Sequence, residues 1–406
     1  MTVPEGPATA PEDGRGLRLA FLVGTISGGT ARHVGALADG CRRAGAAVTV
    51  LGPEPARAGF DPAIPFVPVP IGDKPRPASD TGAVVGLRRE LRRLQPDVVH
   101  AHGVRAGAFA ALAIPARGGP PLPGPARLSS APGRPALVVT IHNAPPEGGL
   151  NRVVYGALER LCARRADAVL CASDDLVARM RKLGAADATR FDVPAPPAGP
   201  PSADAVARAA ADIGADGRPV ILAVGRLARQ KGFDVLIAAA SRWRDTANPP
   251  RTVIAGAGPL ARQLGEQARH AGADVVLLGA RADVPALLAV ADVFVLPSRW
   301  EARALVLQEA MRAGRAIVAT KSGGTPALTG AEAAVLVPPE DDAALAEAVL
   351  AVLDDPALAA ALGLAARARA GSLPTEPDAI RQAMTIYHEL AVSRSTEPPA
   401  PGPQFD

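Results

Sequence analysis

Two cations and two carboxylates in the second half of the chain have the types and spacing to hold a diphosphate and a sugar. Arg226 and Lys231 follow the apolar run PVILAVG (219–225), so both are expected over the carboxyl end of a strand. Each charge-assisted hydrogen bond to a diphosphate there is worth about 1.5–3 kcal/mol. Glu301 and Glu309 supply carboxylates that accept hydrogen bonds from paired hydroxyls, as in sugar and ribose rings. The alternative is that these are surface cations and a solvated helical Glu.

Glycine-containing turns follow several predicted strands, where backbone amides and a helix dipole point at a ligand. The first, GTISGGT (24–30), contains Gly28 and Gly29, and a later one, GAGP (256–259), contains Gly258. The first turn has neither the G-x-G-x-x-G spacing of a dinucleotide fold nor the Lys-Ser/Thr of a P-loop. This disfavours a nicotinamide-dependent dehydrogenase, and a tight turn that needs a positive φ is the alternative interpretation.

Two series of alternating apolar strands and amphipathic helices must position these residues. The alternation predicts an α/β protein with two Rossmann-like, doubly wound domains that face each other across a cleft, with ligands at the carboxyl ends of the strands. The predicted parts are a disordered start (1–16), a first domain (17–192), a proline-rich linker (193–203), a second domain (204–375), a helix (376–392) and a disordered tail (393–406). A proline- and glycine-rich insertion (117–135) is predicted to be a mobile surface loop.

The aromatic content and the charge distribution of the chain indicate which kinds of binding partner to expect. The chain has 406 residues, of which 48% are hydrophobic and 3% aromatic, so a base-stacking nucleic-acid surface is not expected. Residues 1–200 hold 24 basic and 17 acidic side chains, a net +7, whereas the rest of the chain is net −3. This favours an anionic partner for the first half, such as a phosphorylated acceptor or a membrane surface, or else reflects a solvated basic face.

The cellular compartment is predicted from the cysteine spacing, from signal-peptide features and from the length of apolar runs. The three cysteines lack CxxC spacing, which is typical of a reducing compartment. Neither a signal peptide nor an apolar run of about 18 residues is apparent. We therefore expect a cytoplasmic protein, at most peripheral on the inner membrane face. The helix that contains Arg88, Arg89, Arg92 and Arg93 is a candidate for that contact, although a solvated helix face is the preferred interpretation.

The ordered motifs of residues 17–390 resemble those of the retaining family-4 glycosyltransferases, which have the GT-B fold. The matching segments are GGTARHV, DVVHAHG, VTIHNAP, ADAVLCASDDL, VGRLARQKGFDVLI, IAGAGP, VFVLPSRWE, EAMRAG and KSGGTP. The resemblance implies that the second domain binds a nucleotide-diphosphate sugar and that the first binds most of the acceptor. It also implies that helix 376–392 returns to the first domain.

The resemblance assigns roles by position. Arg226 and Lys231 would hold the donor diphosphate, Glu301 the transferred sugar and Glu309 the ribose. The other implied donor contacts are the backbone amides of Ala304 and Leu305, the loop around Arg281, the turns at Gly28, Gly29 and Gly258, and the side chain of His142. His33 and His102 are weaker candidates for the acceptor, as is His100. For His142 a structural role is the alternative, which its place after a strand disfavours.

The implied reaction transfers a hexosyl unit to a hydroxyl acceptor with retention of the anomeric configuration. The leaving diphosphate would help to deprotonate the acceptor. A UDP-sugar is favoured over a GDP-sugar. No D-x-D triplet occurs, so we expect no metal site and no cofactor beyond the donor itself. Ala302 and Ala304 stand where the family usually has glycine, and Ala327 where it has Glu. A catalytically silent binding or scaffolding protein is therefore the alternative.

Overall fold

The computed structural model describes residues 14–26, 28–72, 76–116, 134–144, 149–214 and 216–395. Most of the predicted start (1–16), insertion (117–135) and tail (393–406) lies outside these residues. The chain divides into two compact units. Unit 1 comprises Met1–Val193 and Pro374–Asp406, and unit 2 comprises Pro194–Leu373. The predicted linker begins at this division.

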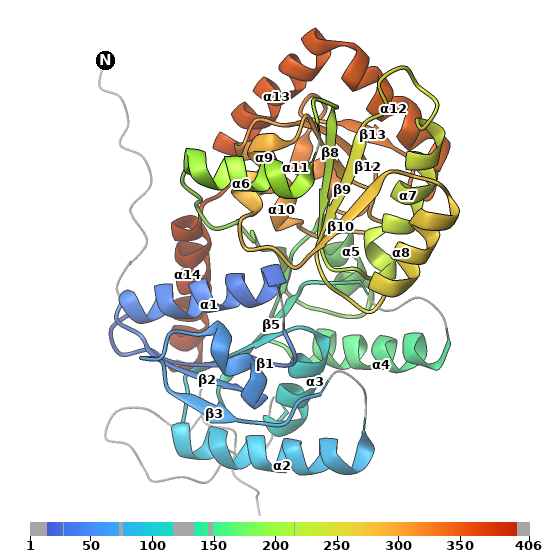
Figure 1. The fold of residues 1–406 in the computed structure, drawn as a ribbon. Coiled ribbons are helices and arrows are strands. Elements are labelled where there is room, and N and C mark those ends of the chain that lie inside the picture. The colour runs from blue at the N-terminus through green and yellow to red at the C-terminus, as the bar shows by residue number, and fades with distance from the viewer. Residues whose placement is uncertain are drawn as a thin grey trace, which may run out of the picture. The chain divides into compact units, whose positions relative to one another are not determined.

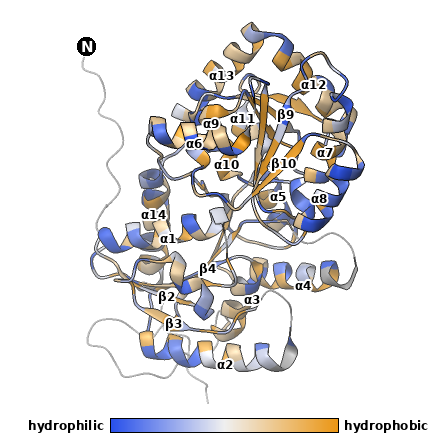
Figure 2. Cartoon of the chain, viewed as in Figure 1, coloured by the Kyte–Doolittle hydropathy of each residue, from blue (hydrophilic) through white to orange (hydrophobic). Residues whose placement is uncertain are grey.

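Unit 1 contains a seven-stranded parallel sheet in the order β3-β2-β1-β4-β5-β6-β7. Its strands are β1 (Arg18–Val23), β2 (Ala47–Gly52), β3 (Phe66–Pro68), β4 (Val98–His102), β5 (Ala136–Ile141), β6 (Ala168–Cys171) and β7 (Ala188–Arg190). The central strands β4 and β5 are buried at every position. This explains their continuous apolar runs, because a parallel sheet is covered on both faces. Figure 2 colours each residue by hydropathy and shows hydrophilic residues on the helices around the sheet.

Helices cover both faces of this sheet (Figure 1). They are α1 (Gly28–Arg43), α2 (Pro77–Leu94), α3 (Val104–Ala113), α4 (Gly149–Arg165), α5 (Asp174–Lys182) and α14 (Glu376–Ser395), with a short 3-10 helix η1 (Glu54–Gly59). The helix α3 packs between α2 and α4, whereas α1 lies on the other face beside α14. Although α14 follows unit 2 in the chain, it packs on α1 and β4, and Gln382 donates a hydrogen bond to the Arg190 carbonyl over 2.9 Å.

Unit 2 contains a six-stranded parallel sheet in the order β10-β9-β8-β11-β12-β13. Its strands are β8 (Val220–Val224), β9 (Arg251–Ala255), β10 (Val275–Gly279), β11 (Val293–Leu296), β12 (Ala316–Thr320) and β13 (Val335–Val337). Successive residues of a strand pack into hydrophobic clusters on opposite faces of the sheet. Ile221 packs in the cluster under α7, α8 and α12, and Leu222 packs in the cluster under α6, α9, α10 and α13.

The helices of unit 2 complete two layers around that sheet (Figure 1). They are α6 (Ala203–Ile213), η2 (Arg229–Lys231), α7 (Phe233–Arg242), α8 (Ala261–His270), α9 (Val284–Val290), α10 (Leu305–Arg312), α11 (Thr325–Thr329), α12 (Asp342–Asp354) and α13 (Pro356–Gly371). Both units are therefore doubly wound α/β structures, which confirms the predicted fold class. The sequence analysis did not predict β3, β7, β13, α6 or α11, which are short or rich in alanine.

Two features of the described residues bear on the predicted surroundings of the protein. No single helix there has the length and hydropathy of a membrane span, and α12 with the following Pro356–Ser393 passes only as a pair bent by 102°. The three cysteines Cys41, Cys162 and Cys171 are free and buried, and burial raises the pKa of each thiol to about 12. Such protonated, enclosed thiols act as small apolar side chains.

Candidate active site

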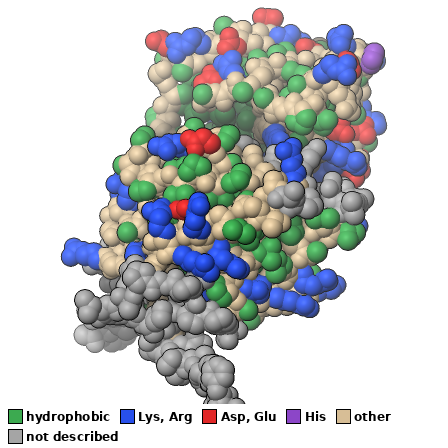
Figure 3. Space-filling model, turned by 90° about the horizontal axis from the view of Figure 1, so that it is seen from below, with side chains coloured by type: hydrophobic (Ala, Val, Ile, Leu, Met, Phe, Trp, Pro, Cys, Tyr) green, Lys and Arg blue, Asp and Glu red, His purple; other side chains and the backbone are tan. Residues whose placement is uncertain are grey.

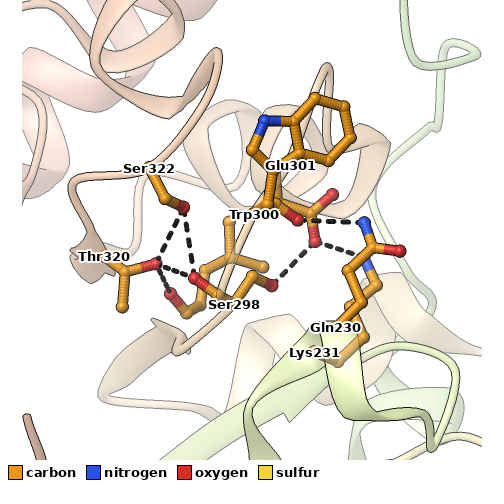
Figure 4. Close-up of polar contacts among 8 residues, drawn as sticks. Gln230, Lys231, Ser298, Trp300, Glu301, Thr320 and Ser322 are labelled. Atoms are coloured by element: carbon orange, nitrogen blue, oxygen red, sulfur yellow. Dashed lines mark hydrogen bonds and ion pairs between the residues drawn. The ribbon is translucent and has the colours of Figure 1, made fainter. Parts of the chain in front are cut away.

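A lysine and a glutamate from two different loops of unit 2 form a close ion pair. Lys231 ends the 3-10 turn η2, which follows β8, and its Nζ lies 2.5 Å from Oε1 of Glu301 in the loop after β11. Ser298 Oγ donates to the same Oε1 over 2.7 Å (Figure 4). The Glu301 residue is only 6% exposed. Both contacts reach Oε1, so a ligand hydroxyl would meet the other carboxylate oxygen, Oε2.

Close backbone approaches fix both loops. Gly232 has φ +63°, and a Cβ there would lie 2.0 Å from the Pro297 carbonyl oxygen. Gly323 has φ +51°, and a Cβ there would lie 2.1 Å from the Glu301 carbonyl oxygen, which also accepts the Gly324 amide over 2.7 Å. Only glycine fits at such positions without displacing backbone. The segment KSGGTP therefore supports the backbone that carries Glu301.

Hydroxyl groups from the end of β12 hold the loop from the other side. Ser322 Oγ donates to the Ser298 carbonyl oxygen over 3.1 Å, and Thr320 Oγ1 donates to the same oxygen. Figure 4 shows this hydroxyl network on one side of Ser298 and the Lys231–Glu301 pair on the other. The side chain that orients Glu301 is thus itself fixed by its neighbours.

The helix α10 begins just after Glu301 and has an open amino terminus. Its N-cap residue, Ala304, has no side-chain oxygen to bond the first amides, and no side-chain cap is present. Ala304 and Leu305 are both buried, and Glu309 lies half-buried farther along the helix. Uncapped first-turn amides and the helix dipole favour a bound anion. Glu301 and Glu309 therefore lie on a loop and a helix respectively, as predicted.

The remaining predicted cation of this loop, Arg226, is exposed. It lies beside Leu227, whose amide donates to Ala257 over 2.9 Å. A Cβ at Gly258 would lie 2.4 Å from the Leu227 carbonyl oxygen, so the turns after β8 and β9 touch through their backbones. Gly258 therefore has a clear packing role.

Arg281, expected in the loop around the base, is engaged in ion pairs. Its guanidinium binds Asp283 at the start of α9 and Asp212 of α6, both at 2.7 Å. The hydrogen bonds that this guanidinium donates to Asp283 and then to Asp212 raise its pKa further. The side chain thus joins two helices, and a contact with a base would come from the backbone of this loop.

Unit 1 brings its predicted histidines together at the carboxyl ends of β4 and β5. His102 Nδ1 lies 3.3 Å from His142 Nε2, and the rings of His33 and His142 meet edge to face at 6.0 Å. His100 bonds instead to Tyr387 and Thr140, at 2.5 and 2.6 Å. All four are buried.

Burial keeps these imidazoles neutral. It lowers the pKa of His33 to about 3, with a smaller contribution from His142, and lowers that of His142 to about 4. The pKa values of His100 and His102 are also lowered well below the usual range by burial and by the neighbouring histidines. The cluster donates and accepts hydrogen bonds at neutral pH without carrying charge.

The glycine-rich turn of unit 1 is shorter than predicted. Gly28, with φ +58°, and Gly29 already belong to the first turn of α1, whereas both were assigned to the turn 24–30. The helix starts earlier because a glycine adopts this entry conformation without a Cβ clash.

Sequence analysis did not assign roles to Ser298, Gln230 or Arg299. Gln230 Nε2 donates to the Trp300 carbonyl over 2.9 Å, and Arg299 bonds to three segments of unit 2. The available signal was their position, because all three lie within three residues of Lys231 or Glu301. Their partners are distant in sequence, which residue type alone does not reveal.

Comparisons with known proteins agree on one family. The family model described as "Glycosyl transferases group 1" matches residues 218–355, and "Glycosyl transferase 4-like domain" matches residues 28–197. The chain is 30% identical over 298 residues to an alpha-D-kanosaminyltransferase of Streptomyces kanamyceticus, covering 68% of this chain and 74% of that protein. It is 34% identical over 179 residues to a GDP-mannose-dependent alpha-(1-6)-phosphatidylinositol monomannoside mannosyltransferase of Mycolicibacterium smegmatis, covering 41% of this chain and 47% of that protein.

Solved structures show the same fold. Sucrose-phosphate synthase from Thermosynechococcus elongatus superimposes with a TM-score of 0.74 at 21% identity, covering 93% of this chain and all of that one. Anabaena HepE, in complex with UDP and glucose, superimposes with a TM-score of 0.71 at 19% identity, covering 94% of this chain and all of that one. With two parallel-sheet α/β units, both family models in order and a relative matched over most of its length, the chain belongs to the group 1 glycosyltransferases and has the GT-B fold.

Proposed function

We propose that this glycosyltransferase moves a hexosyl unit from a nucleotide-diphosphate sugar to a hydroxyl acceptor, with retention at the anomeric carbon and without a metal. The observation that carries the proposal is the Lys231–Glu301 pair at 2.5 Å, with both polar contacts of the carboxylate on Oε1. A sugar hydroxyl donates to Oε2, while the Lys231 ammonium exchanges part of its contact with Glu301 for a phosphate oxygen.

The chemistry assigned to unit 2 is electrostatic. As the bond between sugar and diphosphate breaks, negative charge grows on the leaving phosphate. Lys231, Arg226 and the uncapped amides of α10 stabilise that charge because they are in place before the reaction. The diphosphate then helps to take the acceptor's proton on the face that it leaves, which retains the configuration.

The donor is proposed to be a UDP-sugar, with a GDP-sugar as the second candidate. HepE was solved with UDP and glucose, which supports the first, and a mycobacterial relative is named for its dependence on GDP-mannose, which supports the second. Glu309 is proposed to bind the ribose and the backbone near Arg281 the base. A backbone contact at the base is compatible with either nucleotide.

Unit 1 is proposed to supply the acceptor contacts, with His142 also reaching the donor sugar. Figure 3 shows one face of the molecule, in which Lys and Arg side chains are common and Asp and Glu side chains sparse over the lower part. This supports a phosphorylated or lipid-linked acceptor, in agreement with the net +7 of residues 1–200.

A donor screen tests the proposal. Wild-type protein is incubated with UDP- and GDP-sugars in EDTA, and thermal shift, donor hydrolysis and the anomer of the released sugar are measured. A bound donor raises the melting temperature by mass action. Lys231→Met should sharply reduce the shift and the hydrolysis while leaving a measurable residual rate, whereas Lys182→Met, an exposed lysine of α5 in unit 1, should preserve both.

Four results would count against parts of the proposal. Failure of every sugar nucleotide to bind would reject the donor site. Hydrolysis that stops in EDTA and returns with a divalent cation would reject metal independence. Release of the inverted anomer would reject retention, and binding without turnover for any acceptor would favour the silent alternative.

A further inference from the structure

The ion pair of the proposed donor site joins two loops that must stay in register. Lys231 lies in a three-residue turn and Glu301 in the loop after β11, seventy residues later in the chain. Both are flexible types of segment, and a shift of about 1 Å at such a site costs as much as 100-fold in rate. The contacts that align the two loops therefore matter to the reaction as much as the pair itself.

Three hydrogen bonds join residues 229–230 to residues 299–300 and so align the two loops. These four residues form the zipper. The Arg299 amide donates to the Gln230 carbonyl over 2.8 Å, and Gln230 Nε2 donates to the Trp300 carbonyl over 2.9 Å. Arg299 Nη1 donates to the Arg229 carbonyl over 2.8 Å. The two residues that precede Lys231 are thus bound to the two residues that precede Glu301, which brings the pair opposite each other.

The Arg299 guanidinium anchors this zipper to the rest of unit 2. Nη1 and Nη2 bind the two oxygens of Asp234, each over 2.8 Å, in the first turn of α7. Nε binds Glu340, in the loop after β13, over 2.9 Å. The Arg299 side chain is only 13% exposed, whereas its partners Asp234 and Glu340 are 37% and 61% exposed, so the guanidinium is enclosed more fully than the carboxylates that it binds.

Both residues whose carboxylates bind Arg299, Asp234 and Glu340, are influenced by this contact. Burial raises the pKa of Asp234, but the hydrogen bonds and charge of Arg299 outweigh it and leave that pKa below its usual value. Glu340 has φ +62°, a left-handed backbone conformation that is unfavourable for a non-glycine residue. The bond to Arg299 offsets part of the cost of that conformation. A lysine, with one ammonium group, has no planar fork to reach all three segments.

We propose that Arg299 is a positioning residue of the donor site, which acts through Lys231 by fixing the turn that carries it. The inference rests on the proposed function and names a residue that touches neither member of the Lys231–Glu301 pair through its side chain. Its effect therefore depends on the presence of the Lys231 ammonium.

A double-mutant cycle tests this dependence. Arg299→Gln and Lys231→Met are made singly and together, and KM for the donor, kcat and the melting temperature are measured. Arg299→Gln should raise KM about 10-fold with a smaller change in kcat, because the loosened turn weakens a binding contact. In the Lys231→Met background the same substitution should change kcat/KM by less than about twofold. Equal effects in both backgrounds would overturn the proposal.

The controls separate position from stability. Arg242 lies on α7, as does Asp234, the partner of Arg299; it bonds across unit 2 to Asp342 over 2.6 Å, but its side chain is 51% exposed. Arg242→Gln should leave KM unchanged. If Arg299→Gln does not fold, Arg299→Lys serves instead, and its KM should again rise only when Lys231 is present. Absence of turnover and nucleotide binding in the wild type would reject the proposed function, whereas wild-type activity with an additive cycle would reject Arg299 alone.

Discussion

Each unit contains a buried glutamate paired with a cation, and the two pairs differ in how fully the carboxylate is used. In unit 1, Glu159 of α4 binds Arg179 of α5 through both oxygens, at 3.0 Å and 2.5 Å. In unit 2, Glu301 receives both of its contacts on one oxygen. The Glu159 carboxylate uses both oxygens to join two helices, whereas the Glu301 carboxylate still has Oε2 to accept a hydrogen bond from a ligand. The comparison separates a structural pair from a functional one by geometry.

The histidines of unit 1 extend this difference. Strand ends in unit 1 present neutral imidazoles: His102 lies within hydrogen-bond distance of His142, and His100 bonds to Tyr387 and Thr140. Strand ends in unit 2 present charged groups on loops. Lowering the pH should therefore mainly reduce the stability of unit 1, whereas substitution of a charged side chain in unit 2 should mainly reduce activity.

The largest expected effect is on turnover. Glu301→Gln keeps the shape of the side chain but removes its charge, so it should lower kcat/KM by about 1000-fold, similar to the loss of a preorganised transition-state contact. The melting temperature should change by only a few degrees. Steady-state kinetics and calorimetry measure the two, with Glu266→Gln, on the surface of α8, as the matched control. An active Glu301→Gln would remove the functional half of the comparison.

The next effect is acid destabilisation of unit 1. In the unfolded chain histidines bind protons near pH 6.5, whereas folded His33 and His142 stay neutral down to about 3 and 4. The free energy of unfolding therefore has its full value above pH 6.5 and decreases as the pH falls toward 4. At pH 5 the decrease is about 2 kcal/mol per histidine. These two residues should lower the melting temperature by about 10 °C between pH 7 and pH 5.

Thermal unfolding followed by circular dichroism measures this slope, and hydrogen exchange assigns it to a unit. His33→Phe should reduce the slope by the contribution of one proton, whereas His270→Gln, at an exposed site in unit 2, should leave it unchanged. A slope that is unaffected by His33→Phe would show that the cluster takes up protons while folded.

A smaller effect is expected from the structural pair itself. Glu159→Gln leaves Arg179, which is 40% exposed, without its carboxylate partner. It should lower the free energy of unfolding by about 2 kcal/mol, because water compensates part of the loss at the exposed arginine. Chemical denaturation measures this, and kcat/KM should stay within about twofold of wild type. A large loss of activity with unchanged stability would reverse the roles assigned to the two glutamates.

The smallest effect concerns the basic surface of unit 1. All four arginines of α2 are exposed; Arg88 bonds to the Ala113 and Leu112 carbonyls, and both Arg93 and Arg89 pair with Glu90. If unit 1 contacts anionic lipid, Arg89→Gln with Arg92→Gln should reduce co-sedimentation with phosphatidylglycerol vesicles several-fold, because each cation near an anionic surface adds to the attraction. Arg262→Gln in unit 2 is the control. An absence of wild-type binding would remove the membrane contact.

Motif order and strand–helix alternation were enough to predict the fold class, the loops that carry Lys231 and Glu301, and the helix that carries Glu309. Hydrophobic period and local turn chemistry are properties of neighbouring residues, so the sequence displays them directly. Short elements such as β13 and α11 were missed because three to five residues give no period, and tertiary contacts stabilise them.

The sequence by itself determined which chemical groups this protein has and on which strand ends they occur. Only the tertiary structure decided which of them meet. It paired Lys231 with Glu301, engaged Arg281 with two aspartates and made Arg299 the anchor of three segments. The physical reason is distance: a hydrogen bond requires contact within about 3 Å. Residues seventy positions apart reach that contact only through the packing of the whole unit.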